Sequence, residues 1–343
     1  MKALVLEEYN KLVYKDVPVP EIKNNEVLVR VKACGICGSD VHGMDGSSGR
    51  RIPPIIMGHE ASGVIEKIGQ DVANWKHGDR VTFDSTIYPL NDWFTLKGMY
   101  NLSENRKVLG VSPGEYRQHG AFAEYVAVPE HILYKLPEDV DFVQAAMVEP
   151  VAVACHAIEL TKLSVQDSIV VIGAGMIGLF LIQVLTNIQA GQVIALDIDD
   201  KKLELARQFG ANLCLNPKNQ NVQKEIYKVT ENRGADIAFE AVGNTESLNL
   251  SINSVRKGGT VTLIGNLAAE AQFPLQSVVT RQIRVQGSCA IAGEYPMVLS
   301  MMQKRLIDIG PMLSATAPLS EGASWFKRLY DKEPGLYKVV LIP

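Results

Sequence analysis

The sequence has few cysteines, no block of charge of one sign and no leader-like start, and each of these absences excludes a class of protein. Five cysteines, an odd number scattered along 343 residues, do not form a disulfide framework. The net charge is −4, and lysine and arginine form no cluster. The sequence therefore has no basic patch that would bind a nucleic acid or an anionic membrane. The first residues have the pattern of a strand and lack the apolar run and cleavage site of a signal peptide. We therefore expect a cytoplasmic protein with no nucleic-acid partner.

One long uncharged stretch, residues 169–188, has the length needed to cross a bilayer. Gly173-Ala-Gly175 interrupts it directly after a short β-branched run. A buried strand followed by a buried helix explains this pattern better than a membrane span does, and we expect no membrane partner.

The length and the texture of the sequence indicate two domains. A single hydrophobic core stops growing at roughly 250–300 residues, and a composition of 47% hydrophobic and 21% charged residues is that of an ordinary globular protein. Residues 1–150 read as short β-rich pieces separated by glycine, proline, asparagine and aspartate, which predicts an irregular β domain with long loops. The strands expected there cover residues 2–6, 26–33, 61–68, 80–83 and 122–128.

From about residue 151, strand-like runs alternate with amphipathic helical stretches, as in the βαβ units of a parallel, doubly wound sheet. The predicted fold class is therefore α/β, with one domain at 1–150 and 290–343 and the other at 151–289. Expected strands cover residues 169–172, 192–197, 213–215, 237–241 and 260–264, and expected helices cover 176–189, 201–209, 222–230 and 245–255. Beyond residue 287 we expect one more helix, at 295–305, and a closing strand at 338–342 that can return to pair with the first domain.

The stretch from Cys34 to Glu60 contains the donor atoms of a metal site. Cys37, His59 and Glu60 offer a thiolate, an imidazole and a carboxylate, and a catalytic zinc ion uses three protein ligands of these kinds with a fourth position open. Plainer interpretations stay open for the Cys34-x-x-Cys37 pair. A thioredoxin-like redox pair is expected inside a small βαβ domain, a structural zinc clip needs a second cysteine pair, and the residues can also bind no metal.

Gly173-x-Gly175-x-x-Gly178 follows a strand-like run and opens a helical stretch, which is the context that a dinucleotide-binding loop requires. Gly173 permits the tight turn, Gly175 lets a pyrophosphate approach the helix N-terminus, and Gly178 allows the helix to pack closely on the strand. Asp197, at the end of the next strand, can accept hydrogen bonds from the adenosine ribose and would repel a 2′-phosphate, so NAD is favoured over NADP. Lys202 can lie over the adenine edge. The alternative is a glycine-rich turn that binds nothing.

Further polar residues near these motifs are candidates for catalysis. Glu149 lies where the β domain passes into the nucleotide domain and can reach back to a metal, although alone it reads as a surface or cap residue. Asp40 either fixes the tautomer of His59 or is simply a turn residue. Ser39 can hold a substrate hydroxyl, and His42 can pass its proton to solvent.

These motifs, together with several shorter ones, carry a resemblance that spans the chain. The matching segments are residues 37–42, 58–63, 78–81, 148–150, 173–178 and 338–343. In them the sequence resembles the zinc-dependent medium-chain alcohol dehydrogenases, closest to the polyol branch of sorbitol dehydrogenase-like and galactitol-phosphate dehydrogenase-like enzymes. The resemblance implies a GroES-like β domain and a Rossmann domain with the active site in the cleft between them, in a homodimer or homotetramer.

The resemblance also implies roles for individual residues. Cys37, His59 and Glu60 would carry the catalytic zinc, and Glu149 would bind it directly or through the zinc water. The residues implied along the cofactor are Gly173, Gly175, Ile177, Gly178, Asp197, Lys202, Ile264, Asn266, Ser288 and Ala290.

One departure from the family concerns a second metal. The family usually has a lobe with four cysteines that bind a structural zinc, and the positions in register here are Pro89, Asp92, Thr95 and Ser103. None supplies a thiolate, so we expect one catalytic zinc per chain and no structural zinc. Packing of Trp93, Phe94 and Leu102, with turn hydrogen bonds, would hold the lobe instead.

Another departure concerns specificity. An Arg-Tyr pair that touches the polyol in sorbitol dehydrogenases is replaced by Ala290 and Ile291, and the tyrosine after the relay histidine is replaced by Gly43. Sorbitol itself is therefore not the expected substrate. Three arginines can either accept an anionic substrate or be solvated surface residues: Arg50, Arg51 and Arg281.

The predicted function is a zinc-dependent oxidoreductase that transfers hydride between a secondary alcohol and NAD, giving the ketone. One rival is a zinc-free quinone or enone reductase on the same fold, which would have no need for the metal donors. The other is a dehydrogenase fold that serves only as a binding or structural protein. A pairing surface between subunits is expected near residues 282–286.

Overall fold

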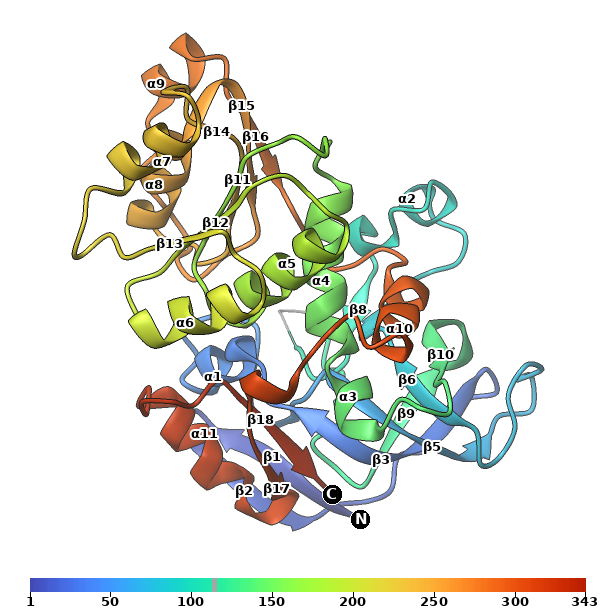
Figure 1. Ribbon diagram of the computed structural model, residues 1–343. Coiled ribbons are helices and arrows are strands. Elements are labelled where there is room, and N and C mark those ends of the chain that lie inside the picture. The colour runs from blue at the N-terminus through green and yellow to red at the C-terminus, as the bar shows by residue number, and fades with distance from the viewer. Residues whose placement is uncertain (113–115) are drawn as a thin grey trace. The chain divides into compact units, whose positions relative to one another are not determined.

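The computed structural model describes residues 1–112 and 116–343. The chain divides into two compact units (Figure 1): one is Met1–Glu149 together with Ile291–Pro343, and the other is Pro150–Ala290. The first unit is thus built from both ends of the chain, whereas the second is one continuous segment.

The first unit is mainly antiparallel β-structure. Its strands are β1 Lys2–Glu8, β2 Lys11–Asp16, β3 Glu26–Gly35, β4 Ile55–Ile56, β5 Glu60–Ile68, β6 Arg80–Phe83, β7 Thr86–Ile87, β8 Lys107–Val108, β9 Tyr125–Pro129, β10 Leu133–Lys135, β17 Leu313–Pro318 and β18 Lys338–Ile342. The main sheet has the order β10-β6-β5-β3-β18-β17, and β9 also pairs with β3. The closing strand β18 runs antiparallel to β3, with Leu341 opposite Cys34. This confirms that the end of the chain returns to the first domain.

Short helices connect these strands. They are α1 Gly38–Met44, α2 Trp93–Leu96, α3 Phe142–Ala146, α10 Tyr295–Gln303 and α11 Gly322–Tyr330. The expectation of one further helix after residue 287 was wrong, because α11 follows α10. Helix α11 is amphipathic and buries Phe326 edge-on against Phe122, with the ring centroids 5.6 Å apart. Its short length and exposed basic end, Lys327 and Arg328, concealed it in the sequence.

The second unit is the expected doubly wound domain. Its strands are β11 Ile169–Ile172, β12 Val193–Leu196, β13 Leu213–Leu215, β14 Ala235–Glu240, β15 Val255–Leu263 and β16 Arg284–Gly287. Its helices are α4 Val148–Glu159, which begins in the last residues of the first unit, α5 Met176–Asn187, α6 Asp200–Gln208, α7 Val222–Val229, α8 Thr245–Ser254 and α9 Leu275–Thr280. The sheet order is β13-β12-β11-β14-β15-β16, and every neighbouring pair is parallel. Together with the β-rich first unit, this confirms the α/β fold class.

The core of the second unit explains its sequence pattern. All four residues of β11 are buried, because helices cover a parallel sheet and leave no polar face on its central strands. Helices α5 and α6 pack together beside β11, β12 and β13, while α8 lies against β11, β14 and β15 (Figure 1). The strand order reverses between β11 and β14, and open sheets of this kind bind ligands outside the carboxyl ends of the strands at such a point.

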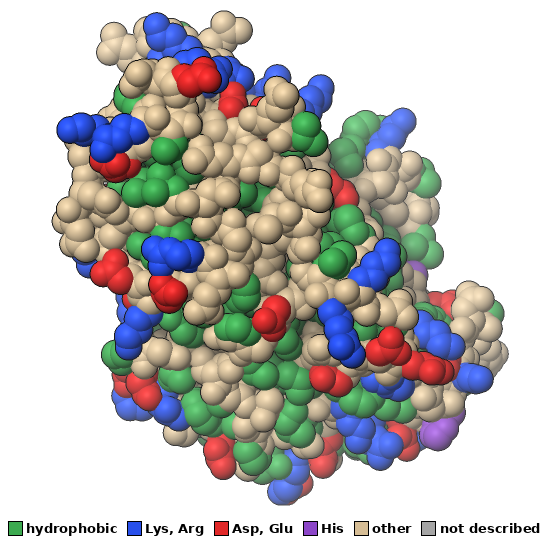
Figure 2. Space-filling view, in the orientation of Figure 1, with side chains coloured by type: hydrophobic (Ala, Val, Ile, Leu, Met, Phe, Trp, Pro, Cys, Tyr) green, Lys and Arg blue, Asp and Glu red, His purple; other side chains and the backbone are tan. Residues whose placement is uncertain are grey.

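The surface agrees with the absence of charge blocks in the sequence. On the face shown in Figure 2, lysine and arginine side chains alternate with aspartate and glutamate, without a large area of either sign. Among the described residues, no helix combines the length and the apolarity that crossing a bilayer would take.

Candidate metal centre and dinucleotide site

Three donor groups meet in the first unit. Cys37 directly precedes α1, His59 directly precedes β5, and Glu60 is the first residue of β5. The ligand atoms of the three side chains, a sulfur, a ring nitrogen and a carboxylate oxygen, all lie within 4.8 Å of one another. The fold thus brings together the donor types that a zinc ion takes.

Two local features create this donor cluster. Strands β3 and β5 pair antiparallel, with Gly35 at the end of β3 opposite Glu60 at the start of β5. Cys37, two residues beyond Gly35, is therefore close to His59 and Glu60. A Cβ on Gly35 would lie 2.4 Å from Glu60 Oε2, so a side chain at this position would displace the Glu60 carboxylate. Cys37 then caps α1: its Sγ accepts a hydrogen bond from the Ser39 N–H at 3.4 Å, and its own N–H donates to Asp40 Oδ2 at 3.3 Å.

Cys34, the other half of the cysteine pair, is not one of the clustered donors. It is fully buried in the hydrophobic core of the first unit. Burial raises its pKa well above the ordinary value, and the negative charges of Asp40 and Glu60 act in the same direction. A thiol held in its neutral form is a poor nucleophile and a poor metal ligand. The pair also lies at the end of β3 rather than in a small βαβ domain, so the redox interpretation finds no support.

Asp40 and His59 form a buried charge pair behind the donors. His59 Nδ1 lies 3.3 Å from Asp40 Oδ1, but the N–H is poorly aligned, so this is a charge contact rather than a formed hydrogen bond. Burial lowers the pKa of His59, but the negative charges of Asp40 and Cys37 outweigh it and raise that pKa well above its ordinary value. Burial would raise the pKa of Asp40, which His59 and Arg51 nevertheless hold well below its usual range. A place that favours positive charge this strongly, with S, N and O donors, fits a zinc ion.

Lys338 completes the cluster from the closing strand. Its ammonium pairs with the carboxylate of Glu60, and the two side chains are only 3% and 1% exposed. Burial lowers the pKa of Lys338, but Glu60 and Cys37 outweigh it and raise that pKa, so the lysine keeps its charge. Sequence reasoning missed this partner. The available signal was a lysine that opens an otherwise apolar strand, Lys-Val-Val-Leu-Ile.

Glu149 lies in the first turn of α4 and is not among the three clustered donors. Burial raises its pKa to about 7, against the positive charge of His59 and with the help of the negative charge of Glu60. The pKa of Glu149 thus depends on the charges of two of the three donors, His59 and Glu60. Its part in holding a metal stays a prediction.

Ser39 and His42 were predicted to move the substrate proton, and both lie on α1. Ser39 Oγ is 3.2 Å from Cys37 Sγ and 3.5 Å from His59 Nε2, so it borders the donor cluster. The His42 side chain is exposed, and its backbone carbonyl accepts a hydrogen bond from Ser47 Oγ at 3.0 Å. The structure therefore places one of the two residues at the donors and the other towards solvent.

The glycine motif of the second unit forms the turn between β11 and α5. Gly173 has a φ of 92°, a conformation that favours glycine. A Cβ on Gly178 would lie 1.8 Å from Gly173 O, so the helix packs on the turn more closely than any side chain allows. Gly175 is the N-cap of α5, and a Cβ there would meet nothing within 4 Å. The space beside Gly175 at the start of α5 is therefore open, and a helix N-terminus with such space suits phosphate binding.

Asp197 follows β12 and reaches the glycine turn. One of its carboxylate oxygens accepts the Ala174 N–H at 2.7 Å, and the other accepts the Asp199 N–H at 2.9 Å. Each carboxylate oxygen has a further lone pair, so ribose hydroxyls can still bind. Ile177 in α5 and Lys202 in α6 lie on the two helices that begin at this edge of the sheet.

The other predicted cofactor residues follow neighbouring strands. Ile264 and Asn266 come after β15, and Ser288 and Ala290 come after β16. A Cβ on Gly243, after β14, would lie 2.3 Å from the Asn266 nitrogen, so these turns touch. Ser288 Oγ is buried without a hydrogen-bond partner in the described part of the chain. Because parallel strands end at one edge, these residues share that edge with the glycine turn, where such sheets bind ligands.

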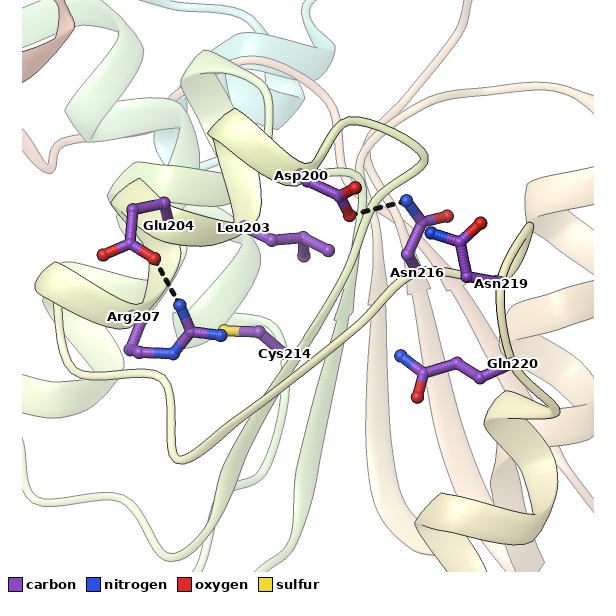
Figure 3. A pocket seen from close by; sticks show the side chains of 8 residues that line it. All are labelled: Asp200, Leu203, Glu204, Arg207, Cys214, Asn216, Asn219 and Gln220. Carbon is purple, nitrogen blue, oxygen red and sulfur yellow. Dashed lines mark hydrogen bonds and ion pairs between the residues drawn. The ribbon is translucent and has the colours of Figure 1, made fainter.

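A separate polar hollow of about 360 Å³ lies beside β13 and α6 (Figure 3). It is lined by Asp200, Leu203, Glu204, Arg207, Cys214, Asn216, Asn219 and Gln220. Its polar groups already bind one another: Arg207 pairs with Glu204, and the Asn216 amide donates to Asp200 at 2.7 Å. None of the predicted cofactor residues lines it, so the dinucleotide site lies elsewhere.

Residues 89–103 form the segment that we call the lobe. Hydrogen bonds join its residues at positions where the family has zinc-binding cysteines. Asp92 caps α2 by accepting the Thr95 N–H at 2.7 Å, and Ser103 Oγ donates to its other carboxylate oxygen. Three of the four positions where the family has cysteine are therefore joined by hydrogen bonds. The Tyr100 hydroxyl donates to the buried Asp84 at 2.7 Å and fixes the lobe to the end of β6.

The expectation that apolar packing holds the lobe was wrong for two of the three named residues. Trp93 and Leu102 are 63% and 42% exposed. The Trp93 ring contacts its neighbour Phe94 edge-on with the centroids 5.1 Å apart, and Tyr88 stacks on Tyr100 with the centroids 4.1 Å apart. Burial in the lobe is confined to its second half: Tyr100, Asn101 and Ser103 are buried, whereas no residue of α2 is.

The three arginines considered for anion binding differ. Arg50 is exposed, and Arg281 in the second unit donates to the carbonyls of Ile252 and Val255. Arg51 is 2% exposed, so the expectation of surface solvation was wrong for this residue. Its guanidinium is buried because Asp40 accepts its Nη2–H at 2.9 Å and compensates its charge.

Comparison with known proteins finds relatives that span the chain. Residues 23–138 match the alcohol dehydrogenase GroES-like domain family, and residues 177–304 match the zinc-binding dehydrogenase family. A sorbitol dehydrogenase of Bacillus subtilis is 30% identical over 100% of this chain and 97% of its own. The galactitol-1-phosphate dehydrogenase structure from Escherichia coli matches with a TM-score of 0.92 at 27% identity, over 100% of both chains. A zinc-binding dehydrogenase of Sinorhizobium meliloti, bound to NADP, matches with a TM-score of 0.90 at 29% identity, over 100% of this chain and 99% of its own.

The match to a relative of this identity over the whole chain, with both domain families in the expected order, establishes the family. The glycine turn and the S, N, O donor cluster are the parts that an NAD(P)-linked alcohol oxidoreductase needs. The chain belongs to the zinc-dependent medium-chain alcohol dehydrogenases, in their sorbitol and polyol dehydrogenase-like branch.

Proposed function

We propose that this protein oxidises a secondary alcohol of the polyol class to the ketone, with one zinc ion per chain and NAD as the hydride acceptor. The observation that carries the proposal is the meeting of the Cys37, His59 and Glu60 donors within 4.8 Å. The polyol class is supported by the two relatives named for sorbitol and galactitol 1-phosphate.

A zinc ion held by these donors supplies a Lewis acid that lowers the pKa of a bound alcohol towards neutrality. The chain's own residues do the rest. Asp40 Oδ1 lies 3.3 Å from His59 Nδ1, so Nε2, on the side of Ser39, is the ring nitrogen that would hold the ion. Ser39 Oγ, 3.2 Å from Cys37 Sγ, is placed to take the proton of the alcohol, and the exposed His42 is placed to pass it to solvent.

Two further charged residues, Lys338 and Glu149, interact with the donor cluster. Lys338 binds Glu60 Oε2 and leaves the other carboxylate oxygen for the metal. Glu149 lies outside the three-donor cluster, and we propose that it would bind the ion directly or through a water molecule.

The choice of NAD over NADP is supported by the Asp197 carboxylate beside the glycine turn, where a 2′-phosphate would meet a negative charge. Replacing Asp197 by alanine together with Ile198→Arg should raise the ratio of kcat/KM for NADP to that for NAD. The matched control is Ile198→Arg alone, which keeps the carboxylate. An unchanged ratio in the double variant contradicts this role of Asp197.

We also propose that the protein is a homodimer or homotetramer that uses the free edge of β16. Leu275 and Val279, one turn apart on α9 beside this strand, are 64% and 67% exposed. Changing Val279 to glutamate should lower the molar mass measured by light scattering, whereas the same change at the exposed Val165 should not. A cytoplasmic location stays a prediction that rests on the scattered free cysteines.

One experiment decides between this function and its rivals. The purified protein is assayed for bound zinc and for NAD-linked oxidation of sugar alcohols, their phosphates, cyclic polyols and short diols, before and after treatment with a chelator. We expect one zinc per chain and polyol oxidation that chelation removes and added zinc restores. Metal-independent reduction of an enone or quinone with NADPH would overturn the proposal in favour of a reductase, and no turnover on any substrate would favour a binding protein.

A further inference from the structure

Arg51 occupies an unusual position for an arginine in a loop rich in glycine and proline. Its side chain is 3% exposed, and its guanidinium lies within the first turn of α1. Nη2 donates to Asp40 Oδ1 at 2.9 Å and to Ser39 Oγ at 3.2 Å. One cation therefore holds both the carboxylate behind His59 and the hydroxyl beside Cys37.

The backbone on either side of Arg51 is fixed as well. The Ser112 N–H donates to Arg50 O at 3.0 Å, and the Ile52 N–H donates to Ser112 Oγ at 2.8 Å. Both neighbours of Arg51 are thus bound to the same residue, so its side chain leaves a defined point of the loop.

Gly43 provides the path by which Arg51 reaches α1. A Cβ at position 43 would lie 2.5 Å from Arg51 Cγ and 3.3 Å from both its Cβ and its Cδ. The aliphatic stem of the arginine therefore occupies the space that a side chain at position 43 would take. Because Gly43 is helical, its own φ and ψ do not require glycine, and the packing of Arg51 is what excludes a larger residue.

The hydrogen-bond capacity of Ser39 gives this contact a chemical consequence. A hydroxyl has one hydrogen and two lone pairs, and a guanidinium can only donate. Arg51 therefore takes one lone pair of Ser39 Oγ and leaves the hydrogen directed at Cys37 Sγ, 3.2 Å away. The third neighbour, His59 Nε2 at 3.5 Å, would hold the zinc ion in the loaded enzyme, so the other lone pair of Ser39 Oγ would then be open to a substrate hydroxyl. The position of the guanidinium decides which way the hydroxyl faces.

We propose that Arg51 is a positioning residue for Ser39, and that Gly43 is the residue that admits it. This inference rests on the proposed function, in which Ser39 Oγ takes the proton of the alcohol while its own hydrogen, directed at Cys37 Sγ in the resting state, turns away from the sulfur and leaves for solvent by way of His42. Arg51 does not touch the reacting atoms. It fixes the Ser39 hydroxyl with a lone pair open to the substrate, and the rate of proton removal depends on that orientation.

The test compares Arg51→Met, Arg51→Lys, Gly43→Ala and Ser39→Ala in the zinc-loaded enzyme. Mutation of a residue that orients the groups around a metal site typically lowers metal affinity or activity by about 10-fold to 100-fold. We expect Arg51→Met to lower kcat by a factor in this range. Zinc content and KM should change little, and the solvent deuterium isotope effect on kcat should rise because proton transfer limits the rate. Arg51→Lys should recover part of the loss.

Gly43→Ala is the gentler variant, since it keeps Arg51 and only displaces its stem. We expect it to lower kcat in the same direction and to have no further effect once Arg51 is methionine. Likewise, Arg51→Met should add nothing in a Ser39→Ala background, because Arg51 acts only by orienting the Ser39 hydroxyl, which that background lacks. Fully additive losses, or a loss of zinc retention as large as the loss of kcat, would overturn the proposal and assign Arg51 to the Asp40–His59 pair.

A second measurement needs no alcohol and no metal, so it separates this inference from the proposed function. In the metal-free protein, the alkylation rate of Cys37 by iodoacetamide, followed by peptide mass mapping, reports whether Ser39 Oγ donates to the thiolate. Ser39→Ala sets the rate without that donor, and Arg51→Met should shift the wild-type rate to the same value. A wild-type rate in Arg51→Met, with a changed rate in Ser39→Ala, would show that Arg51 does not position Ser39.

Discussion

The donor cluster around Cys37 and the lobe at residues 89–103 belong to the same unit, and only the first keeps the chemistry of a metal site. In the donor cluster, buried negative groups face one another and are balanced by Lys338, by Arg51 and by the raised pKa of His59. In the lobe, Asp92, Thr95 and Ser103 satisfy one another with hydrogen bonds. A structural metal can thus be replaced by hydrogen bonds of similar reach, whereas the donor cluster holds charges that hydrogen bonds alone do not balance.

The largest effect is expected from removing the thiolate of the donor cluster. Cys37→Ser replaces a soft sulfur ligand by a hydroxyl that stays protonated, so zinc content and alcohol turnover should fall to background. NAD binding should persist, because the glycine turn belongs to the second unit. Zinc analysis, steady-state assays and NAD titration measure the three quantities.

The matched control for this prediction is Cys214→Ser, a free and half-buried thiol of the second unit. It should keep both zinc and turnover. Polyol oxidation by a metal-free Cys37→Ser protein would remove the contrast between the two regions, because the donor cluster would then be as dispensable as the cysteines of the lobe.

The next largest effect is expected from Lys338→Met. Breaking a buried ion pair on one side leaves an uncompensated charge, here Glu60, and costs about 3–5 kcal/mol. The free energy of unfolding of the metal-free protein, measured in urea, should fall by this amount, and added zinc should recover part of it because the ion supplies positive charge in the folded state alone.

Lys327→Met is the control, since that lysine forms an exposed pair with Asp331 that should contribute less than about 1 kcal/mol. Equal, small losses in the two variants would mean that Glu60 is not held as a buried anion. Zinc addition that fails to stabilise Lys338→Met would contradict the view that metal and lysine share the charge of Glu60.

The sequence predicted those parts of the molecule that depend on neighbouring residues. The period of the strand and helix runs predicted the α/β fold, and the spacing of three glycines predicted the turn after β11. Lys338 was missed because its partner Glu60 is 278 residues away, and no local pattern records that contact. Arg51 was misread because a loop rich in glycine and proline suggests exposure, and its burial depends on the space above Gly43. Trp93 was misread in the opposite sense, because large aromatic residues are usually buried.

A third prediction concerns Asp84, the buried residue to which Tyr100 of the lobe donates a hydrogen bond. Burial raises the pKa of Asp84 from 3.8 to about 6. The folded protein therefore holds this proton more tightly than the unfolded chain, so its contribution to stability is present below about pH 4 and is lost as the pH rises through 6. A shift of about two units corresponds to about 3 kcal/mol. Asp84→Asn should remove this part of the pH dependence, measured as the free energy of unfolding at pH 4, 5, 6 and 7.

Asp92 supplies the comparison of opposite sign. Its hydrogen bond from Ser103 lowers the pKa of the carboxyl, so its contribution is present at neutral pH and is lost as the pH falls through that lowered value. With the measurements extended below pH 4, the difference between wild type and Asp84→Asn and the difference between wild type and Asp92→Asn should therefore slope in opposite directions with pH. Parallel slopes would contradict the raised pKa of Asp84.

The smallest effect is expected from Ser103→Ala, which removes one hydrogen bond from the lobe and leaves the Asp92 cap on α2 in place. A single hydrogen bond of this kind contributes about 1 kcal/mol, so thermal unfolding should shift slightly while zinc content and kcat stay at wild-type values. In an Asp92→Ala background the same change should have almost no effect, since the acceptor is gone. A loss of zinc in Ser103→Ala would show that the lobe takes part in metal binding after all. A purely structural loss of the size of one hydrogen bond would confirm that hydrogen bonds have replaced the ion there.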